Sequence, residues 1–177
     1  MQNRKIKNEE LERKTPEEFK KADKTPVIAV LDNVRSLHNV GSVFRTADAF
    51  LIEAVYLCGI TGCPPNKDIQ KSALGSTETV TWKYFKTTQE AVEELKQSSY
   101  QTWAIEQVEG SISLEKFEIK KDQKYALIFG NEVNGVDQSI VNQCSGSIEI
   151  PQAGTKHSLN VSISSGILLW EFFKELK

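Results

Sequence analysis

The sequence is poor in the residues that build disulfide frameworks and metal sites. It has three cysteines, none in a Cys-x-x-Cys pair, and two histidines among 177 residues. An odd number of isolated cysteines favours a reducing compartment over a disulfide or zinc framework. His38 and His157 are not spaced as metal ligands to each other or to a cysteine. We therefore predict no metal site.

Long apolar runs are also missing. No stretch reaches the roughly 18 apolar residues that cross a bilayer. The first 24 residues are polar and lack the apolar centre of a signal peptide. Hydrophobic residues at 39% and charged residues at 26% are typical of a globular domain with a sizeable core. These features predict a cytoplasmic protein that does not contact membranes.

Charge of one sign does not dominate the chain. The net charge is −2, which by itself does not indicate a nucleic-acid binder. Residues 1–26 hold eight Lys/Arg and six Asp/Glu, a net of +2, which leaves 14 and 18, a net of −4, for the remainder. A solvated helix is the simplest interpretation of this charged segment. We divide the chain into a charged N-terminal extension, 1–25, and one domain, 26–177.

The phosphate-binding motifs of nucleotide enzymes are absent as well. The glycine-containing turn at 129–135 has only Gly130 and Gly135, so it is not a Gly-x-Gly-x-x-Gly motif. No Gly-Lys-Ser/Thr sequence of a P-loop follows it. Ordinary dinucleotide binding and phosphate cradling are therefore disfavoured.

What the sequence does contain is a regular alternation of apolar strands with helical patterns. This alternation predicts an α/β fold, with a mostly parallel six-stranded sheet and helices on both of its faces. Segment 110–122 is polar and is expected to be irregular. The expected strands are 27–31, 54–60, 80–85, 100–106, 125–129 and 147–150. The expected helices are 39–51, 69–74, 87–98, 136–144 and 158–176.

Three loops, at 39–45, 129–135 and 148–161, each follow the carboxyl end of a predicted strand. Ligands of parallel sheets bind beyond these ends, so we expect the loops to form one site. Arg45 is a candidate for holding a phosphate or a developing anion, although spacing alone favours a surface arginine with a packed stem. Asn39 is a plausible helix N-cap. Glu132 fits either a site residue or a solvated turn acid.

The third loop adds two polar candidates. Ser158 is a possible N-cap of the last helix. Asn160 would lie one turn inside that helix, where asparagine is a mediocre helix former, which suggests a polar role for its side chain. A hydrolase triad is disfavoured, because His157 and Ser158 are sequence neighbours and no acidic orienting residue is evident.

Together the three segments resemble the SpoU/TrmH-type RNA ribose 2′-O-methyltransferases of the SPOUT superfamily. The similarity covers roughly residues 26–175. It departs at His157, where a glutamate is common. The matching motifs are NVGSVFRTA at 39–47, FGNE at 129–132 followed by Gly135, and IPQAGTKHSLNV at 150–161.

The resemblance implies a SPOUT methyltransferase domain, in which the C-terminal segment threads a loop as a trefoil knot, a rare exception to the rule against knots. It implies a homodimer in which Arg45 of one subunit reaches the cofactor of the other. S-adenosylmethionine would be held near Ile105, Glu106, Gly130, Ile150 and Leu159. Asn39, Arg45, Glu132, Ser158 and Asn160 would surround the reacting ribose.

Methyl transfer from a sulfonium is an in-line displacement that needs no metal. A guanidinium has a pKa above about 12, so Arg45 suits stabilisation of the developing oxyanion better than removal of a proton. RNA is the implied substrate. We favour tRNA over rRNA, because only about 26 residues precede the first strand, too few for the added RNA-binding domain of some relatives. The alternative is a catalytically silent RNA-binding protein on the same fold.

Overall fold

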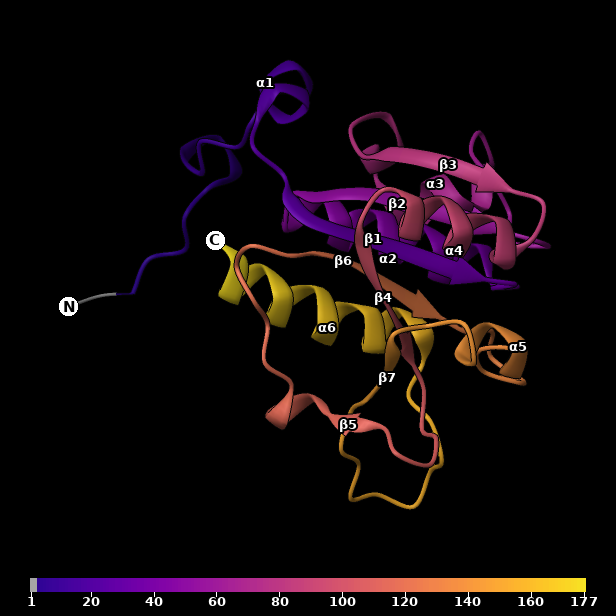
Figure 1. The fold of residues 1–177 in the computed structure, drawn as a ribbon. Coiled ribbons are helices and arrows are strands. Elements are labelled where there is room, and N and C mark those ends of the chain that lie inside the picture. The colour runs from indigo at the N-terminus through magenta and orange to yellow at the C-terminus, as the bar shows by residue number, and fades with distance from the viewer. Residues whose placement is uncertain (1–2) are drawn as a thin grey trace.

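The computed structural model describes residues 3–177, and Asn8 in its backbone only. Its centre is a seven-stranded, fully parallel sheet in the order β3-β2-β1-β6-β4-β7-β5 (Figure 1). The strands are β1 (Thr25–Asp32), β2 (Ile52–Cys58), β3 (Thr81–Phe85), β4 (Tyr100–Ile105), β5 (Ile112–Ser113), β6 (Lys124–Phe129) and β7 (Gly146–Glu149). The prediction of a parallel sheet in an α/β fold is thus confirmed.

The predicted number of six strands is wrong. The seventh strand, β5, lies inside the segment that we expected to be irregular. It consists of Ile112 and Ser113, which pair in parallel with Ile148 and Glu149 at the edge of the sheet. Two residues cannot display a period-2 pattern, so the sequence carries no signal for this strand.

The described residues also form six α-helices and three short 3₁₀ turns. The α-helices are α1 (Pro16–Lys21), α2 (Leu37–Ala49), α3 (Lys67–Ala73), α4 (Thr88–Gln97), α5 (Gln138–Val141) and α6 (Val161–Leu176). The 3₁₀ turns are η1 (Asn8–Glu10), η2 (Ser76–Glu78) and η3 (Leu114–Lys116). Helices α2 and α6 begin at different residues from those predicted, with consequences for the site.

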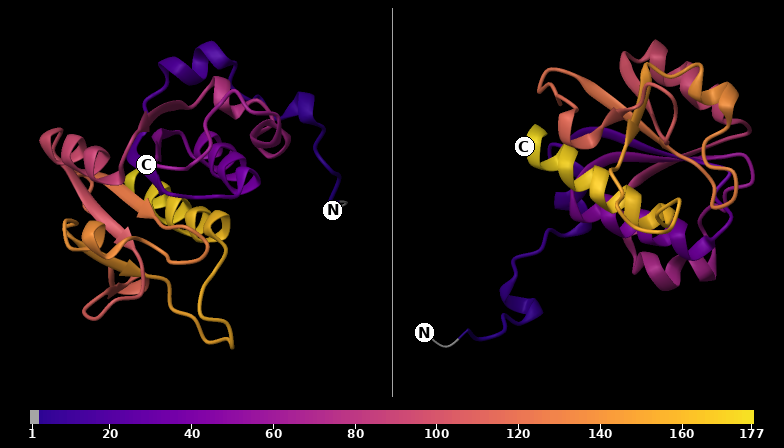
Figure 2. Two further views of the ribbon diagram at one scale, coloured as in Figure 1. Left: turned by 90° about the vertical axis from the view of Figure 1, so that its right-hand side faces the viewer. Right: turned by 90° about the horizontal axis from the view of Figure 1, so that it is seen from below.

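The helices cover both faces of the sheet, as predicted. In the left view of Figure 2 the sheet lies between α4 and α5 on one side and α2 and α6 on the other. Alternate residues of the buried strand β1 belong to the two cores. Leu31 belongs to the core that holds Phe44 of α2 and Phe172 of α6. Val30 belongs to the core that holds Leu95 of α4.

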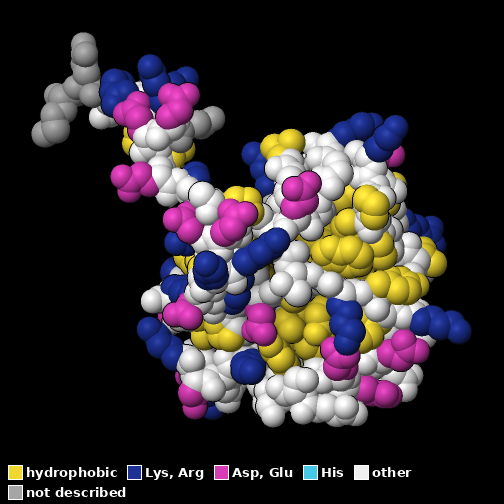
Figure 3. All heavy atoms as spheres, turned by 90° about the horizontal axis from the view of Figure 1, so that it is seen from above, with side chains coloured by type: hydrophobic (Ala, Val, Ile, Leu, Met, Phe, Trp, Pro, Cys, Tyr) yellow, Lys and Arg dark blue, Asp and Glu magenta, His cyan; other side chains and the backbone are white. Residues whose placement is uncertain are grey.

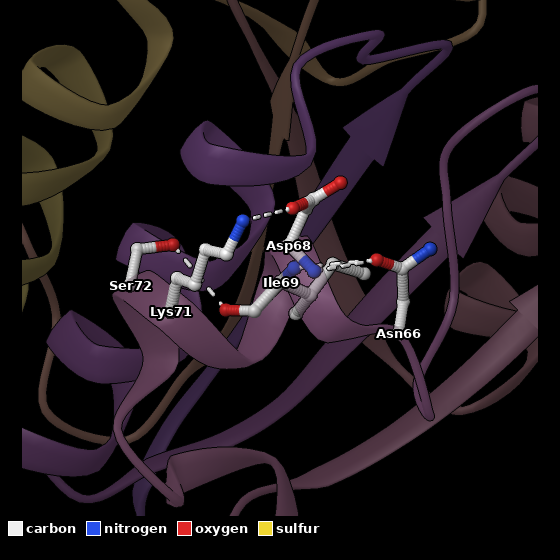
Figure 4. Close-up of polar contacts among 5 residues, drawn as sticks. All are labelled: Asn66, Asp68, Ile69, Lys71 and Ser72. Atoms are coloured by element: carbon white, nitrogen blue, oxygen red, sulfur yellow. Dashed lines mark hydrogen bonds and ion pairs between the residues drawn. The ribbon is translucent and has the colours of Figure 1, made fainter.

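Helices α2 and α3 approach each other closely at Gly41. A Cβ atom at this position would lie 2.2 Å from both the Ile69 carbonyl oxygen and the Ser72 hydroxyl oxygen. The Ser72 hydroxyl also donates a hydrogen bond of 2.9 Å to the His38 carbonyl of α2. Figure 4 shows how α3 is fixed locally: the Asn66 side chain caps its first turn, and Lys71 pairs with Asp68. Glycine in the first motif is therefore required by helix packing.

The N-terminal extension leaves the body of the domain and carries interspersed charges of both signs (Figure 3). Its helix α1 begins at Pro16 behind a complete capping box between Thr15 and Glu18. Phe19, which is 4% exposed, attaches α1 to the core. Residues 1 and 2 of the predicted extension lie outside the described residues.

Two further expectations concern the chain as a whole. Within the described residues, no helix is both long and apolar enough to cross a membrane. The trefoil knot stays a prediction.

We expect Gly41→Ala to destabilise the protein by about 1–3 kcal/mol, because a backbone carbonyl blocks the added methyl group and the helices must move apart. The control is Gly166→Ala in α6, where nothing lies within 4 Å of the added Cβ. That change should be neutral or stabilise by up to about 1 kcal/mol. Urea unfolding of both variants measures the difference, and equal effects would contradict the packing argument.

Candidate active site

A cavity of about 480 Å³ opens where β4, β6 and β7 end and α6 begins. The three predicted site loops do not contribute equally: 129–135 and 148–161 line the cavity, whereas 39–45 does not. All five residues predicted to hold a cofactor line it, namely Ile105, Glu106, Gly130, Ile150 and Leu159. Three of the five predicted catalytic residues, Glu132, Ser158 and Asn160, also line it.

The loop after β6 folds back on itself and forms one wall of the cavity. Asn131 and Gly135 exchange two backbone hydrogen bonds of 3.1 Å. A Cβ atom at Gly130 would lie 1.9 Å from the Gly135 carbonyl carbon, and Gly135 itself has a φ of +68°. Both glycines of the second motif are thus needed to close this turn.

Glu106 fastens the same loop from the neighbouring strand. Its carboxylate accepts hydrogen bonds from the Val136 N–H at 2.9 Å and the Gln107 N–H at 3.0 Å. A Cβ atom at Gly135 would lie 2.0 Å from the Glu106 Oε2. We predicted Glu106 as a cofactor contact, and the structure adds this bracing of the cavity wall.

Glu132 joins the second motif to the first. Its carboxylate accepts hydrogen bonds from the Arg35 N–H at 3.2 Å, the Ser36 N–H at 3.2 Å and the Asn39 side-chain amide at 3.0 Å. Burial opposes ionisation of Glu132, but the backbone N–H groups of Glu132, Arg35 and Ser36 and the Asn39 amide together lower its pKa. Glu132 is exposed, as a turn acid would be, but its carboxylate is held by three hydrogen-bond donors of the chain.

Asn39 is not the helix N-cap that we predicted. Ser36 caps α2 by accepting a hydrogen bond of 3.3 Å from the Asn39 N–H. Helix α2 therefore begins at Leu37, and Asn39 lies in its first turn. The Asn39 side chain does not cap the helix and instead donates a hydrogen bond to the Glu132 carboxylate.

The start of the last helix is also corrected. Helix α6 begins at Val161, and Asn160 is its N-cap, accepting hydrogen bonds from the Ser162 N–H at 2.8 Å and the Ser162 hydroxyl at 2.6 Å. Asn160 is thus not one turn inside the helix, and Ser158 is not a cap. The Asn160 side-chain NH₂ and the Ser158 hydroxyl donate no hydrogen bond within the described residues, so both are available to a ligand.

Two predicted catalytic residues, Asn39 and Arg45, do not line the cavity of their own chain; Asn39 still contacts Glu132 on its wall, whereas Arg45 contacts none of the described lining residues through a hydrogen bond. It lies in the middle of α2, six residues beyond Asn39, which corresponds to about 9 Å along the helix. Its side chain is exposed, as the spacing in the sequence favoured. Within the described residues it forms no hydrogen bond or ion pair.

The charge of the cavity limits what it can bind. Among the described residues, Glu106, Glu132 and Glu149 line it together with His157, and no lysine or arginine does so. The backbone N–H and C=O groups of Gly130, Ile150 and Leu159 form no hydrogen bond within the described chain. The arrangement therefore suits a ligand that is cationic in part and is held by the backbone, and it disfavours a phosphate.

Sequence reasoning missed Asp32, which is 1% exposed at the end of β1. Its carboxyl group accepts hydrogen bonds from the Thr88 hydroxyl at 2.5 Å, the Asn33 side-chain amide at 2.8 Å and the Asp137 N–H at 3.1 Å. The signal for this residue in the sequence is an acidic side chain at the end of a buried apolar strand.

The described residues contain no group of three or more His, Cys, Asp or Glu side chains placed to hold a metal ion.

The sequence pattern described as the SpoU rRNA Methylase family matches residues 26–170. This chain belongs to that family. The resemblance predicted from the three motifs is thereby confirmed. The 23S rRNA (guanosine-2′-O-)-methyltransferase RlmB of Vibrio parahaemolyticus is 30% identical to this SpoU family member over 151 residues, which cover 85% of this chain and 60% of that protein. The chain spans about 60% of the length of the curated relatives that it matches.

Solved structures with the same fold belong to RNA-modifying enzymes. An AdoMet-bound rRNA methyltransferase from Sinorhizobium meliloti has a TM-score of 0.80 and 26% identity to this SpoU family member, and the match covers 90% of this chain and 60% of that one. The A. aeolicus TrmH/SpoU tRNA modifying enzyme has a TM-score of 0.77 and 28% identity, and the match covers 89% of this chain and 78% of that one.

We expect Glu132→Gln to lower the free energy of unfolding by about 1 kcal/mol at neutral pH, because a neutral amide accepts hydrogen bonds less strongly than a carboxylate. The folded-state pKa of Glu132 lies below the ordinary value of 4.5. The stabilisation is therefore complete above about 4.5 and is lost as the pH falls through the lower folded value.

Denaturant unfolding at about pH 7 and about pH 3 measures this change. The difference between the wild type and Glu132→Gln should shrink at the lower pH. The exposed Glu115→Gln is the matched control and should show little difference at either pH. A Glu132→Gln effect that is the same at both pH values would contradict the ionic contact.

Proposed function

We propose that this chain is a catalytic domain that transfers a methyl group from S-adenosylmethionine to a ribose 2′-hydroxyl of RNA. One observation carries the proposal: Glu132, on the wall of the cavity that gathers the predicted cofactor residues, is bonded to Asn39 of the first motif. We propose the cytoplasm as the compartment of this reaction.

The cavity fits S-adenosylmethionine in size and chemistry. Its volume of about 480 Å³ lies within the range of roughly 300–1,000 Å³ that is usual for small-molecule sites. The free backbone groups of Gly130, Ile150 and Leu159 would hold the neutral parts of the cofactor. Three carboxylates suit its sulfonium and ammonium groups. When bound, S-adenosylmethionine supplies an electrophilic methyl group.

The residues of the chain would position and activate the 2′-hydroxyl. Alignment of the reacting oxygen at roughly 3–3.5 Å supplies much of the rate. The free Ser158 hydroxyl and Asn160 amide would bind the ribose. Glu132 already accepts three hydrogen bonds and has a lowered pKa, which makes it a weak base. We therefore assign Glu132 the role of positioning Asn39 and the first motif.

Arg45 would stabilise the oxyanion that develops on the ribose. Because it does not line the cavity of its own chain, we propose that it acts at the cavity of a second copy. A homodimer would also cover the exposed apolar strip of α6, formed by Ile163, Ile167 and Trp170 at 55%, 37% and 49% exposure. Trp170 packs against Phe50, the C-cap of α2, at a ring separation of 5.5 Å.

We propose tRNA as the substrate, with rRNA as the alternative. The tRNA modifying enzyme is matched over 78% of its length, whereas the two rRNA methyltransferases are matched over only 60%. A catalytically silent RNA-binding role is disfavoured, because the chain retains every residue that the motifs place at the ribose.

The test is incubation of the protein with methyl-labelled S-adenosylmethionine and with tRNA and rRNA separately, followed by mapping of the labelled nucleotide. We expect a 2′-O-methylated nucleotide in tRNA, formed equally well in the presence of a chelator. Calorimetry with the cofactor and with its demethylated product should show binding under the same conditions. No heat with either compound, or a label on a base, would overturn the proposal.

We predict that Arg45→Ala lowers the rate of methyl transfer by about 10²–10³ and leaves cofactor affinity nearly unchanged, because one preorganised charge is lost outside the cofactor cavity. Arg45→Lys should restore little activity, since an ammonium lacks the planar fork of a guanidinium. Single-turnover rates and cofactor titration measure the two effects. Wild-type turnover in Arg45→Ala would exclude this role, and methylation of an RNA with a 2′-deoxy nucleotide at the target would exclude ribose chemistry.

We predict a dimer of about 40 kDa, twice the chain mass of 19.9 kDa, by light scattering at micromolar concentration. Trp170→Glu places a charge in the apolar strip and should shift the protein toward the monomer. Leu74→Glu is the matched control, because Leu74 is 65% exposed in another part of the domain. A wild-type monomer, or equal effects of the two substitutions, would contradict the proposed interface.

A further inference from the structure

A second cavity, of about 270 Å³, lies on the other side of the loop after β6. Asn131, Asn134 and Gly135 line both cavities, so this loop is the wall between them. The opposite side of the second cavity is formed by Arg35, in the loop after β1, and by Ile60, in the loop after β2. The proposed methylation reaction assigns no role to this cavity.

Side-chain hydrogen bonds hold the framework of the second cavity in place. Asn33 has a φ of +54°, and its side-chain oxygen accepts a hydrogen bond of 3.2 Å from the Ile60 N–H. The Asn131 side-chain oxygen accepts from the Val133 N–H at 3.0 Å and the Asn134 N–H at 2.9 Å. The side-chain oxygens of Asn33 and Asn131 are therefore already hydrogen-bonded to the loops around the cavity, so the cavity exists before a ligand binds.

Three other side chains remain available to a ligand. Within the described residues, the Arg35 guanidinium and the side-chain amide of Asn134 form no hydrogen bond or ion pair. Asp137 uses only its Oδ1, which accepts from the Ser139 N–H at 2.8 Å and the Ser139 hydroxyl at 2.5 Å. Its Oδ2 is free. Ile60, which is 64% exposed, adds an apolar surface beside these donors and acceptors.

This combination is suited to a nucleobase rather than a phosphate. Arginine and asparagine donate to ring nitrogens and carbonyl oxygens, while an aspartate accepts from an exocyclic amino group. An apolar side chain or a guanidinium plane can pack against the face of an unstacked base. Asp32 and Asp137 place two carboxyl groups against the single Arg35 cation, so the cavity does not attract a phosphate anion. The Ser139 hydroxyl and N–H lower the pKa of Asp137, which keeps this acceptor ionised.

The cavity is also linked to the proposed reaction centre. Arg35 is one of the residues that line the cavity, and its backbone N–H donates to the Glu132 carboxylate at 3.2 Å. A base bound beside Arg35 therefore belongs to a nucleotide close to Glu132.

We propose that this second cavity receives the base of the nucleotide whose ribose is methylated, and that Asp137 selects bases with an exocyclic amino group over uracil. The inference rests on the proposed function and deepens it, because it names the part of the RNA that is read and the residue that reads it.

The first experiment uses the RNA substrate with each of the four bases at the methylated position. A well-formed base contact should give the wild type a roughly 5- to 150-fold lower rate with uridine than with the preferred base. Asp137→Asn preserves the N-cap of α5, because asparagine caps as well as aspartate. It should reduce the preference at least about 5-fold. Asp122→Asn, an exposed change outside both cavities, should leave the preference unaltered.

The outcomes separate the two proposals. Equal rates for all four bases, or an unchanged preference in Asp137→Asn, would overturn base selection while leaving ribose methylation intact. Absence of ribose methylation by the wild type would instead overturn the proposed function.

A second measurement does not depend on catalysis. In NMR titrations of the full chain with cytidine and with uridine, cytidine should shift the amide signals of Ile60 and Asn134 more strongly. Asp137→Asn should remove this difference, and Asp122→Asn should not. Shifts confined to residues of the first cavity, or no difference between the nucleosides, would overturn the inference.

Discussion

The buried carboxyl group of Asp32 is the interaction on which the functional edge of this fold depends. An unpartnered carboxylate in such a position would cost several kcal/mol. Here three donors satisfy it, and they come from the loop after β1, the first residue of α4 and the start of α5. One side chain thus fixes three chain segments at the carboxyl end of the sheet. The loop that separates the two cavities lies directly before the α5 anchor.

Two further carboxylates, those of Glu106 and Glu132, bind backbone N–H groups of the loops that form the site. Glu106 binds the Val136 N–H, and Glu132 binds the N–H groups of Arg35 and Ser36. Each joins loops that are distant in the sequence, and each uses an oxygen that has two or more lone pairs to share. Glu106 and Glu132 therefore act mainly by positioning the chain around the cavity, and Glu132 also holds Asn39, which lies beside the cavity wall and does not line it.

Much of the fold could be predicted because its signals are local. The strand cores at β1, β2 and β6 are continuous apolar runs, and Thr87 at the start of α4 caps that helix as its sequence indicates. The sequence did not predict strand β5, because this strand is defined by its pairing with β7 and has no residue pattern of its own.

The candidate site was harder to predict than the fold. Sequence spacing identified the loops, and five predicted cofactor residues line one cavity. The helix starts at α2 and α6 were misplaced because Ser36, Asn39, Ser158 and Asn160 are all plausible caps. Only the three-dimensional partners of each side chain decide between them. The bracing role of Glu106 likewise depends on contacts that spacing does not encode.

The order of the strands has a consequence for how the chain folds. The central strand β1 pairs with β6, about 100 residues later, and its core face is covered by α6, the last helix. During synthesis β1 can pair with β2 early, whereas its other edge and the α6 cover of its core face must wait for almost the entire chain. Such distant pairing raises the loop-closure entropy of the folding transition state and slows folding. The β6 edge of the apolar strand β1 would remain unpaired in the nascent chain for that time, which exposes it to incorrect pairing until β6 emerges.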